Sequence, residues 1–290
     1  MKLQLTFFLA ALASAFAAEE TPEELRAKLL RTRNLQSDDS NTPGGDGDSE
    51  EGGDGNDFPP CFSAFDTVEA QGKGMISMDS LEIGDYVRAG KDFSRVFSFA
   101  HLDLDAEGNF LQIHTEGSVA PLEITDNHML FRDDKAVSAK EVSVGDMLGD
   151  NKVTKITSVK RTGLYAPITY DGSIVVNGIK SSCYVQFLDH VPADQHQVLE
   201  HMFFSLQRVA CSVNFGWCEA ETYTDGLSDY SRWAINAYTY SNQFSAPVQW
   251  LLTAISGLIF PTWYFAEQIY LLHILLAVGF LLYKSTKKSA

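Results

Sequence analysis

Cys61 is the residue whose type and position point most directly to chemistry. It is the first residue after an acidic, glycine-rich tract, residues 36–60, and it begins a stretch with the composition of a packed domain. A thiolate there can attack the carbonyl carbon of Pro60 and move the preceding chain from nitrogen to sulfur, if the fold strains the amide and protonates the departing amine. We therefore predict that the Pro60–Cys61 bond is the substrate of a self-processing reaction.

A polar insert between two apolar pieces supplies two partners for this reaction. Thr125 and His128 belong to the sequence Thr-Asp-Asn-His, which follows Leu122–Ile124 and precedes Met129–Phe131. The Thr125 hydroxyl can hydrogen-bond the scissile amide, and His128 can give a proton to the α-amine of Cys61. A threonine and a histidine at this spacing in a turn are more often structural, so the pair is only a candidate by itself.

The remaining cysteines and one histidine allow more than one interpretation. Cys183 can pair with Cys61, tune its reactivity, or be a small buried apolar residue, the usual role of a free cysteine. His101 stands just before an acidic stretch, where a lone histidine is ordinarily structural. Cys211 and Cys218 can form a disulfide with each other in an oxidising compartment.

The sequence predicts that short strands position these residues. Alternating apolar runs separated by Gly, Asp and Asn predict an all-β domain over residues 61–190. The expected strands are Tyr86–Arg88, Val96–Phe99, Phe110–His114, Leu122–Thr125, Lys152–Val159 and Ser173–Val176, with turns at Asp171-Gly172 and Asn177-Gly178. Residues 80–87 are echoed by residues 141–148, each with Gly-Asp before a strand, which fits a domain of two related halves.

The N-terminal flank has the composition of processing and linker segments. Residues 1–17 predict a cleaved signal peptide, with an uncleaved anchor as the alternative, so we expect entry into the secretory pathway. Residues 18–60 predict a short helix to about Arg33 followed by disordered, acidic chain.

The C-terminal flank is apolar. Residues 191–260 predict helices, one of them over His196–Leu206, and residues 261–290 predict a hydrophobic helix with a basic tail. We expect the last segment to associate with a membrane, as a span or an interfacial hairpin, with a buried helix packed on the β domain as the alternative.

Charge and ligand spacing argue against two classes of function. The formal net charge of −16, much of it in the acidic tract, disfavours nucleic acid, whose binding depends on Lys and Arg. A metal site built from His190, His196, Glu200 and His201 is disfavoured because His196 and His201 are five residues apart and do not share a helix face.

Several of these segments, taken in order, resemble the Hint domain of Hedgehog proteins. The resemblance covers Cys61 to about Gln186, and it rests on Cys61-Phe62, Leu81-x-x-Gly84-Asp85, Phe110–Thr115, Ile124-Thr125-x-x-His128, Gly163–Gly178 and Ser182-Cys183-Tyr184. It implies a mainly β, pseudo-twofold Hint (Hedgehog/intein) horseshoe, here followed by hydrophobic C-terminal helices.

The resemblance also implies a cysteine-dependent self-cleavage through an N-to-S acyl shift, with a single turnover. Cys61 is then the nucleophile, Thr125 and His128 assist, and Cys183 is a second cysteine near the first. In Hedgehog precursors a sterol hydroxyl attacks the thioester. The implied partners are therefore the chain's own N-terminal peptide and a sterol, another lipid or water, with no cofactor.

This sequence departs from the family pattern at two positions in the site. Pro60 stands where the family has Gly, and His101 falls where Hedgehogs have the aspartate that activates sterol; neutral imidazole can also act as a base. The chain lacks a Hedgehog signalling domain before Cys61, and residues after Pro192 take the place of an adduct-recognition segment. An intein is disfavoured because no closing Asn junction is present. The non-enzyme alternative is an inactive Hint-fold module anchored to a membrane.

Overall fold

The computed structural model describes the backbone of residues 61–186, 191–241 and 243–288, and the side chains of these residues up to Tyr270 except Tyr238. The expected signal peptide, short helix and acidic linker lie outside the described residues, as does His190.

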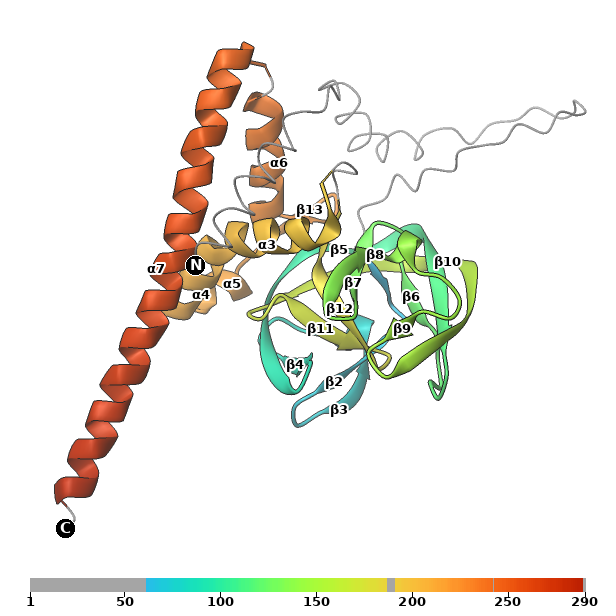
Figure 1. The fold of residues 1–290 in the computed structure, drawn as a ribbon, viewed down its shortest axis with the longest axis horizontal. Coiled ribbons are helices and arrows are strands. Elements are labelled where there is room, and N and C mark those ends of the chain that lie inside the picture. Colours follow the sequence, from blue (N-terminus) through green and yellow to red (C-terminus); the bar gives the residue numbers. More distant parts are fainter. Residues whose placement is uncertain (1–60, 187–190, 242, 289–290) are drawn as a thin grey trace, which may run out of the picture.

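The first described segment forms a β domain, as predicted, that lies beside the helices of the C-terminal region (Figure 1). Its strands are β1 Phe62–Ser63, β2 Thr67–Ala70, β3 Gly74–Ser77, β4 Tyr86–Ala89, β5 Asp92–Thr115, β6 Leu122–Ile124, β7 His128–Arg132, β8 Lys135–Ser138, β9 Met147–Leu148, β10 Asn151–Thr169, β11 Ser173–Val176 and β12 Ile179–Val185. They join in the order β8-β7-β12-β11-β2-β4-β5-β6-β1-β10-β9, with β3 on β2 and a further pairing of β5 with β10.

One difference from the expected strands is that β5 is continuous. The apolar pieces Val96–Phe99 and Phe110–His114 are parts of the same 24-residue strand, although a polar stretch separates them. That stretch stays in the sheet because β5 pairs with β10 along most of its length, for example Glu107 with Thr162. Bulges in this ladder bend the long ribbon around the domain.

The sequence echo is an internal structural repeat, which confirms the prediction of two related halves. Gly84 and Gly145 both have positive φ, 103° and 100°, a region that glycine adopts without a Cβ penalty. Gly84 N–H donates to the Val96 carbonyl at 2.9 Å, and Gly145 N–H donates to the Val153 carbonyl at 2.8 Å. A short 3-10 helix precedes each turn, at Met78–Ser80 and Ala139–Glu141.

The second described region is helical. It comprises α3 Ala193–Phe203, α4 Ser205–Val213, α5 Gly216–Glu219, the hairpin β13 Tyr223–Thr224 and β14 Leu227–Ser228, α6 Asp229–Ser241 and α7 Ala246–Lys288. The helix expected over His196–Leu206 is split at Phe204. The Ser205 hydroxyl donates to the Met202 carbonyl at 2.6 Å, an alternative partner that ends the regular helical ladder.

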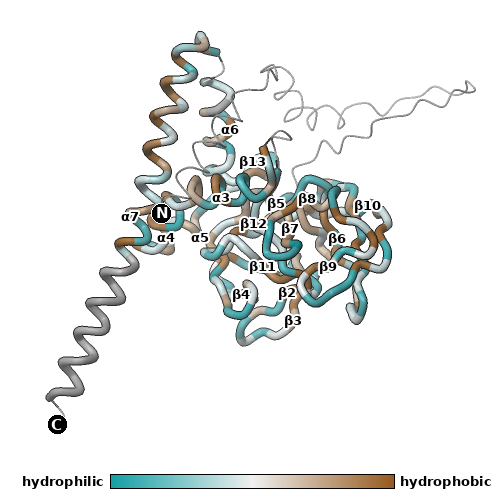
Figure 2. The backbone as a smooth tube through the Cα atoms, viewed as in Figure 1, coloured by the Kyte–Doolittle hydropathy of each residue, from teal (hydrophilic) through white to brown (hydrophobic). Residues whose placement is uncertain are grey.

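The last helix, α7, runs through the boundary that we expected between residues 260 and 261, with Pro261 in its interior. Figure 2 shows hydrophobic residues along its described half. A bidentate ion pair fixes it to α4: Arg208 Nε and Nη2 each lie 2.8 Å from an oxygen of Glu267, and both side chains are buried. Among the described residues, no helix is long and apolar enough to cross a membrane.

Candidate active site around Cys61

Cys61 is held at the centre of the β domain by the two-residue strand that follows it. Phe62 in β1 pairs with Ile124 of β6 on one side and with Tyr165 of β10 on the other. Neither Cys61 nor Phe62 is exposed to solvent. The nitrogen of the predicted scissile bond is therefore fixed between two strands before any reaction begins.

Thr125 contacts the backbone of Cys61 on both sides of its Cα. The Cys61 N–H donates to Thr125 Oγ1 at 2.7 Å, and the same hydroxyl donates to the Cys61 carbonyl at 3.3 Å. The Thr125 N–H also donates to that carbonyl, at 3.0 Å. Thr125 comes directly after β6, so the strand that pairs with Phe62 also delivers the hydroxyl to the amide.

His101 contacts the thiol. Its Nδ1 lies 3.2 Å from Cys61 Sγ, and only 4% of its side chain is exposed. In the tautomer with the proton on Nε2, Nδ1 accepts a hydrogen bond from the thiol. The structure therefore brings His101 and Thr125, which lie 40 and 64 residues after Cys61 in the sequence, into contact with Cys61.

Burial keeps both members of the thiol–imidazole pair neutral. It raises the pKa of the Cys61 thiol well above its ordinary value, and the Asp103 carboxylate adds to the rise. Burial lowers the pKa of His101 to about 4, against the opposing effect of Asp103. At neutral pH the resting pair is thus a thiol beside a neutral base, and the proton must move during the attack.

His128 packs against Phe62, the residue that follows Cys61. Its Nε2 donates to the Ser182 carbonyl at 2.9 Å, and its ring packs on the Phe62 ring with centroids 4.2 Å apart. The contact with Ser182 orients the ring, so a proton that this histidine transfers must move through Nδ1.

Cys183 lies in a different part of the core from Cys61. Both are free, buried thiols. Cys183 Sγ lies 3.5 Å from Thr169 Oγ1, and burial raises the pKa of Cys183 to about 12. Cys61 instead belongs to a small separate cluster with Phe110, Leu164 and Ala166.

The β13–β14 hairpin reaches this site from the helical region and was not among the elements expected from the sequence. Leu227 in β14 pairs with His101, and the Leu102 N–H donates to the Gly226 carbonyl at 2.7 Å. The sequence feature that could have predicted the hairpin is the Asp225-Gly226 dipeptide, which is favoured in two-residue hairpin turns. The flanking strands are two residues each, which is too short for an alternating pattern.

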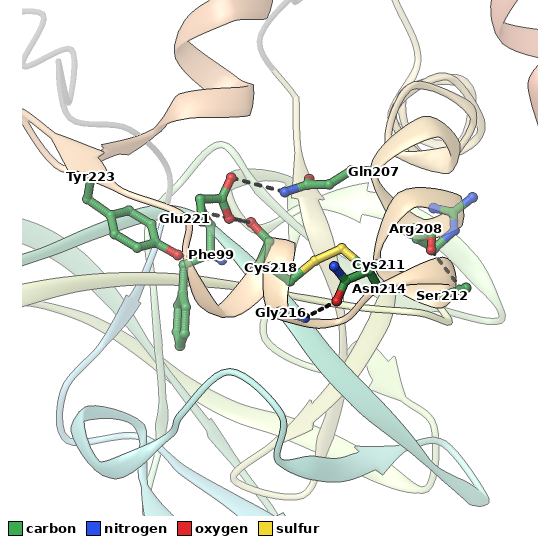
Figure 3. The surroundings of a disulfide bond; sticks show 11 residues. Phe99, Gln207, Arg208, Cys211, Ser212, Asn214, Gly216, Cys218, Glu221 and Tyr223 are labelled. Carbon is green, nitrogen blue, oxygen red and sulfur yellow. Dashed lines mark hydrogen bonds between the residues drawn. A yellow bond between two sulfur atoms is a disulfide. The ribbon is translucent and has the colours of Figure 1, made fainter.

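A disulfide joins Cys211 in α4 to Cys218 in α5 (Figure 3). Beside it lies an open surface pocket of about 390 Å³, whose lining includes Trp217, Glu221, Tyr230 and Trp233. Its lining residues come from α4, α5 and α6 and from the segment that leads into the hairpin.

Two of the residues considered for a metal site bond to residues outside that set. His201 Nδ1 lies 2.9 Å from the Tyr184 hydroxyl, and Glu200 accepts a hydrogen bond from the Val185 N–H at 3.3 Å. Within residues 61–186, 191–241 and 243–288, no group of three or more His, Cys, Asp or Glu side chains is arranged to hold a metal ion.

Comparison with known proteins identifies one family. The family described as Hint module matches residues 56–241, more than half of the chain and beyond the boundary expected near residue 190. Warthog protein 6 of Caenorhabditis elegans is 31% identical over 173 residues, which cover 53% of this chain and 28% of that protein. Protein hedgehog of Drosophila melanogaster is 29% identical over 146 residues, which cover 43% and 31%.

The chain therefore spans less than a third of the length of these curated relatives. Among solved structures, the gp41-1 intein matches with a TM-score of 0.38 and 14% identity, over 43% of this chain and 99% of the intein chain. On the family match and on its Hedgehog and Warthog relatives, the chain belongs to the Hint module family of self-processing proteins, and its Hint domain is of the Hedgehog type.

Proposed function

We propose that this protein cleaves its own Pro60–Cys61 bond through a thioester and passes the N-terminal peptide to a hydroxyl acceptor. The observation that carries the proposal is that both reactive atoms of Cys61 have a partner. The amide nitrogen donates to Thr125 at 2.7 Å, and Sγ lies 3.2 Å from Nδ1 of His101.

In the first step, Sγ attacks the carbonyl carbon of Pro60 while the thiol proton passes to His101 Nδ1. A carbon–sulfur bond forms, the carbon–nitrogen bond breaks, and the Cys61 nitrogen becomes an amine that takes up a proton. His101, with a pKa of about 4, then gives up the proton from the thiol and is neutral again before the second step. Thr125 holds that nitrogen in place, and His128 beside Phe62 is the candidate proton donor. The burial that keeps the thiol neutral makes this transfer necessary.

In the second step, an acceptor hydroxyl attacks the thioester, the carbon–sulfur bond breaks, and the sulfur recovers a proton. His101 lies beside the sulfur and is neutral at pH 7, so it is the proposed base for the acceptor. Lipid as the acceptor is supported by exposed apolar residues on α7, among them Trp250, Leu251, Leu258 and Trp263, and by the open, aromatic-lined surface pocket of about 390 Å³.

We also propose that the protein enters the secretory pathway and associates with membrane lipid through its C-terminal region. The disulfide between Cys211 and Cys218 supports the first part, because disulfides persist mainly in oxidising compartments. The exposed apolar face of α7 supports the second.

Release of the peptide by hydroxylamine tests the first step. Hydroxylamine attacks thioesters without reducing the Cys211–Cys218 disulfide, so the fold of the helical region is preserved. We expect it to accelerate release of the peptide that ends at Pro60, and we expect Cys61→Ala to abolish release. Equal release from the wild type with and without hydroxylamine would contradict a thioester.

The mass of the released peptide tests the second step. In the presence of sterol-containing vesicles, transfer gives a peptide whose mass exceeds that of the free acid by the mass of the lipid minus that of one water. A free carboxylate at Pro60, with vesicles present, would assign the acceptor role to water instead. An intact chain under all conditions would favour an inactive Hint-fold module, in which the buried, neutral thiol of Cys61 does not attack.

A further inference from the structure

The β13–β14 hairpin is bonded at several points to β5, the strand that carries His101. Ser98 of β5 donates to Glu221 at 2.5 Å, just before the hairpin. The Phe99 N–H donates to the Tyr223 hydroxyl at 3.3 Å, and Figure 3 shows this hydroxyl directed at Phe99. The Leu102 N–H donates to the Gly226 carbonyl at 2.7 Å. These contacts fix the hairpin on both sides of His101.

Gly226 lies directly on the imidazole ring. It has φ of 75° and follows Asp225 with φ of 51°, as in the type I′ turns of two-residue hairpins. A Cβ at this position would overlap Nε2 of His101 and would lie 2.9 Å from its Cδ2. The close approach therefore requires a residue without a side chain, apart from the requirement of the turn.

The two edges of the His101 ring thus have different surroundings. Nδ1 lies 3.2 Å from Cys61 Sγ, where the thioester would form, and Nε2 lies under the backbone of the hairpin. With 4% of the side chain exposed, water has little access to the ring. The segment that closes it belongs to the helical region rather than to the β domain proper.

We propose that Gly226 is a positioning residue that closes the β13–β14 hairpin over the Nε2 edge of His101, and that this closure protects the thioester from hydrolysis. In hydrolysis a water oxygen attacks the thioester carbon, its proton passes to His101, and the departing sulfur of Cys61 takes that proton. The hairpin limits the water that can reach the base, so it favours an acceptor delivered to the thioester over bulk water. The inference rests on the proposed self-cleavage.

The partition of the thioester tests the inference. Gly226→Ala must lift the hairpin or tilt the ring, so the ratio of hydrolysis to hydroxylamine-induced release should rise several-fold. Gly72→Ala is the matched control, because Gly72 has φ of 80° and no atom within 4 Å of an added Cβ. It carries the same backbone strain without the contact, and its ratio should equal that of the wild type. Equal ratios in both variants would overturn the inference.

A second measurement does not depend on cleavage. The ring of His101 can be titrated by NMR in the full chain carrying Cys61→Ala, with His101→Gln to assign its signal. The groups beside the ring are the residue-61 side chain, just before β1, and Asp103 on β5; Asp225 precedes Gly226 in the turn. Opening the hairpin hydrates the ring, so Gly226→Ala should move its pKa from about 4 toward 6.5.

Tyr223→Phe is a milder variant for the same titration, since it removes the hydroxyl bonded to Phe99 N–H without backbone strain. It should shift the titration in the same direction by less. An unchanged titration in both Gly226→Ala and Tyr223→Phe would overturn the inference whether or not the wild type cleaves. A wild type that fails to cleave would instead contradict the proposed function, while a shifted titration would still show that the hairpin closes over His101.

Discussion

Cys61 illustrates what a single residue reveals in the sequence and what it does not. Its place between the acidic tract and the folded domain indicated a nucleophile. The polar insert Thr125–His128 supplied its candidate partners, which the family resemblance also implied. The contact between Sγ and Nδ1 of His101 could not be predicted, because it depends on the path of a bent strand that pairs with β10. The distance suggests a role for His101 in the first step as well as the second.

The hydroxyl of Thr125 should matter mainly for the first step. Thr125→Val keeps the shape but leaves the buried Cys61 N–H without its acceptor, which costs about 1–3 kcal/mol and should slow thioester formation by about tenfold to a hundredfold. The rate of hydroxylamine-induced release measures this. Thr125→Ser is the control and should retain most of the rate. If Thr125→Val cleaves at the wild-type rate, the hydroxyl has no part in the shift.

Among the helices, α7 is positioned by a contact that the sequence could not show. Glu267 appeared there only as a charge that interrupts an apolar run. In the structure it accepts both arms of the Arg208 guanidinium, and the Arg208 side chain also lies 3.4 Å from His201 Nδ1. Periodicity predicted that α7 is helical, but its direction depends on tertiary contacts, among them this ion pair across 59 residues of chain and the packing of Phe203 on Phe260.

Breaking the ion pair should loosen α7 without affecting the β domain. Arg208→Met leaves the Glu267 carboxylate buried without its partner, and we expect a loss of about 3–5 kcal/mol in the free energy of unfolding of the helical region. Urea titration and limited proteolysis within α7 measure it. The double variant Arg208→Met/Glu267→Leu is the control and should recover stability. Equal proteolysis of wild type and Arg208→Met would argue against this anchor.

Across the whole molecule, the strand pattern and the repeated Gly-Asp turns predicted the β domain and its two halves. The helical region was harder, because its segments are short or uniformly apolar and give weak periodicity. The hairpin at Asp225-Gly226 is the clearest example. Its turn is visible in the sequence, but its place on His101 follows from long-range pairing with β5.

Buried histidines should make stability depend on pH. The pKa of His101 is lowered to about 4 by burial, and its ordinary value is about 6.5. Between these values the unfolded chain binds a proton that the folded chain does not, so His101 lowers the free energy of unfolding as pH falls from 6.5 to 4. Urea titrations at both pH values should show a smaller loss in His101→Gln, by on the order of 2 kcal/mol.

His114→Gln is the control for this comparison, because the His114 ring is only partly buried. Buried acids such as Asp66, whose pKa is raised, change the free energy of unfolding in the opposite direction. The test therefore compares the pH dependence of the variants with that of the wild type, and it does not use the pH dependence of the wild type alone. The same pH dependence in wild type and His101→Gln would mean that His101 is not buried as a neutral ring.

Intact-mass analysis of the full chain, with sterol-containing vesicles present, is the most direct measurement of self-cleavage. The wild type should yield a product that begins at Cys61 and ends at Ala290, and Cys61→Ala should yield none. Only the uncleaved chain in both samples, or an equal amount of the product from Cys61→Ala, would contradict cleavage by the thiol of Cys61.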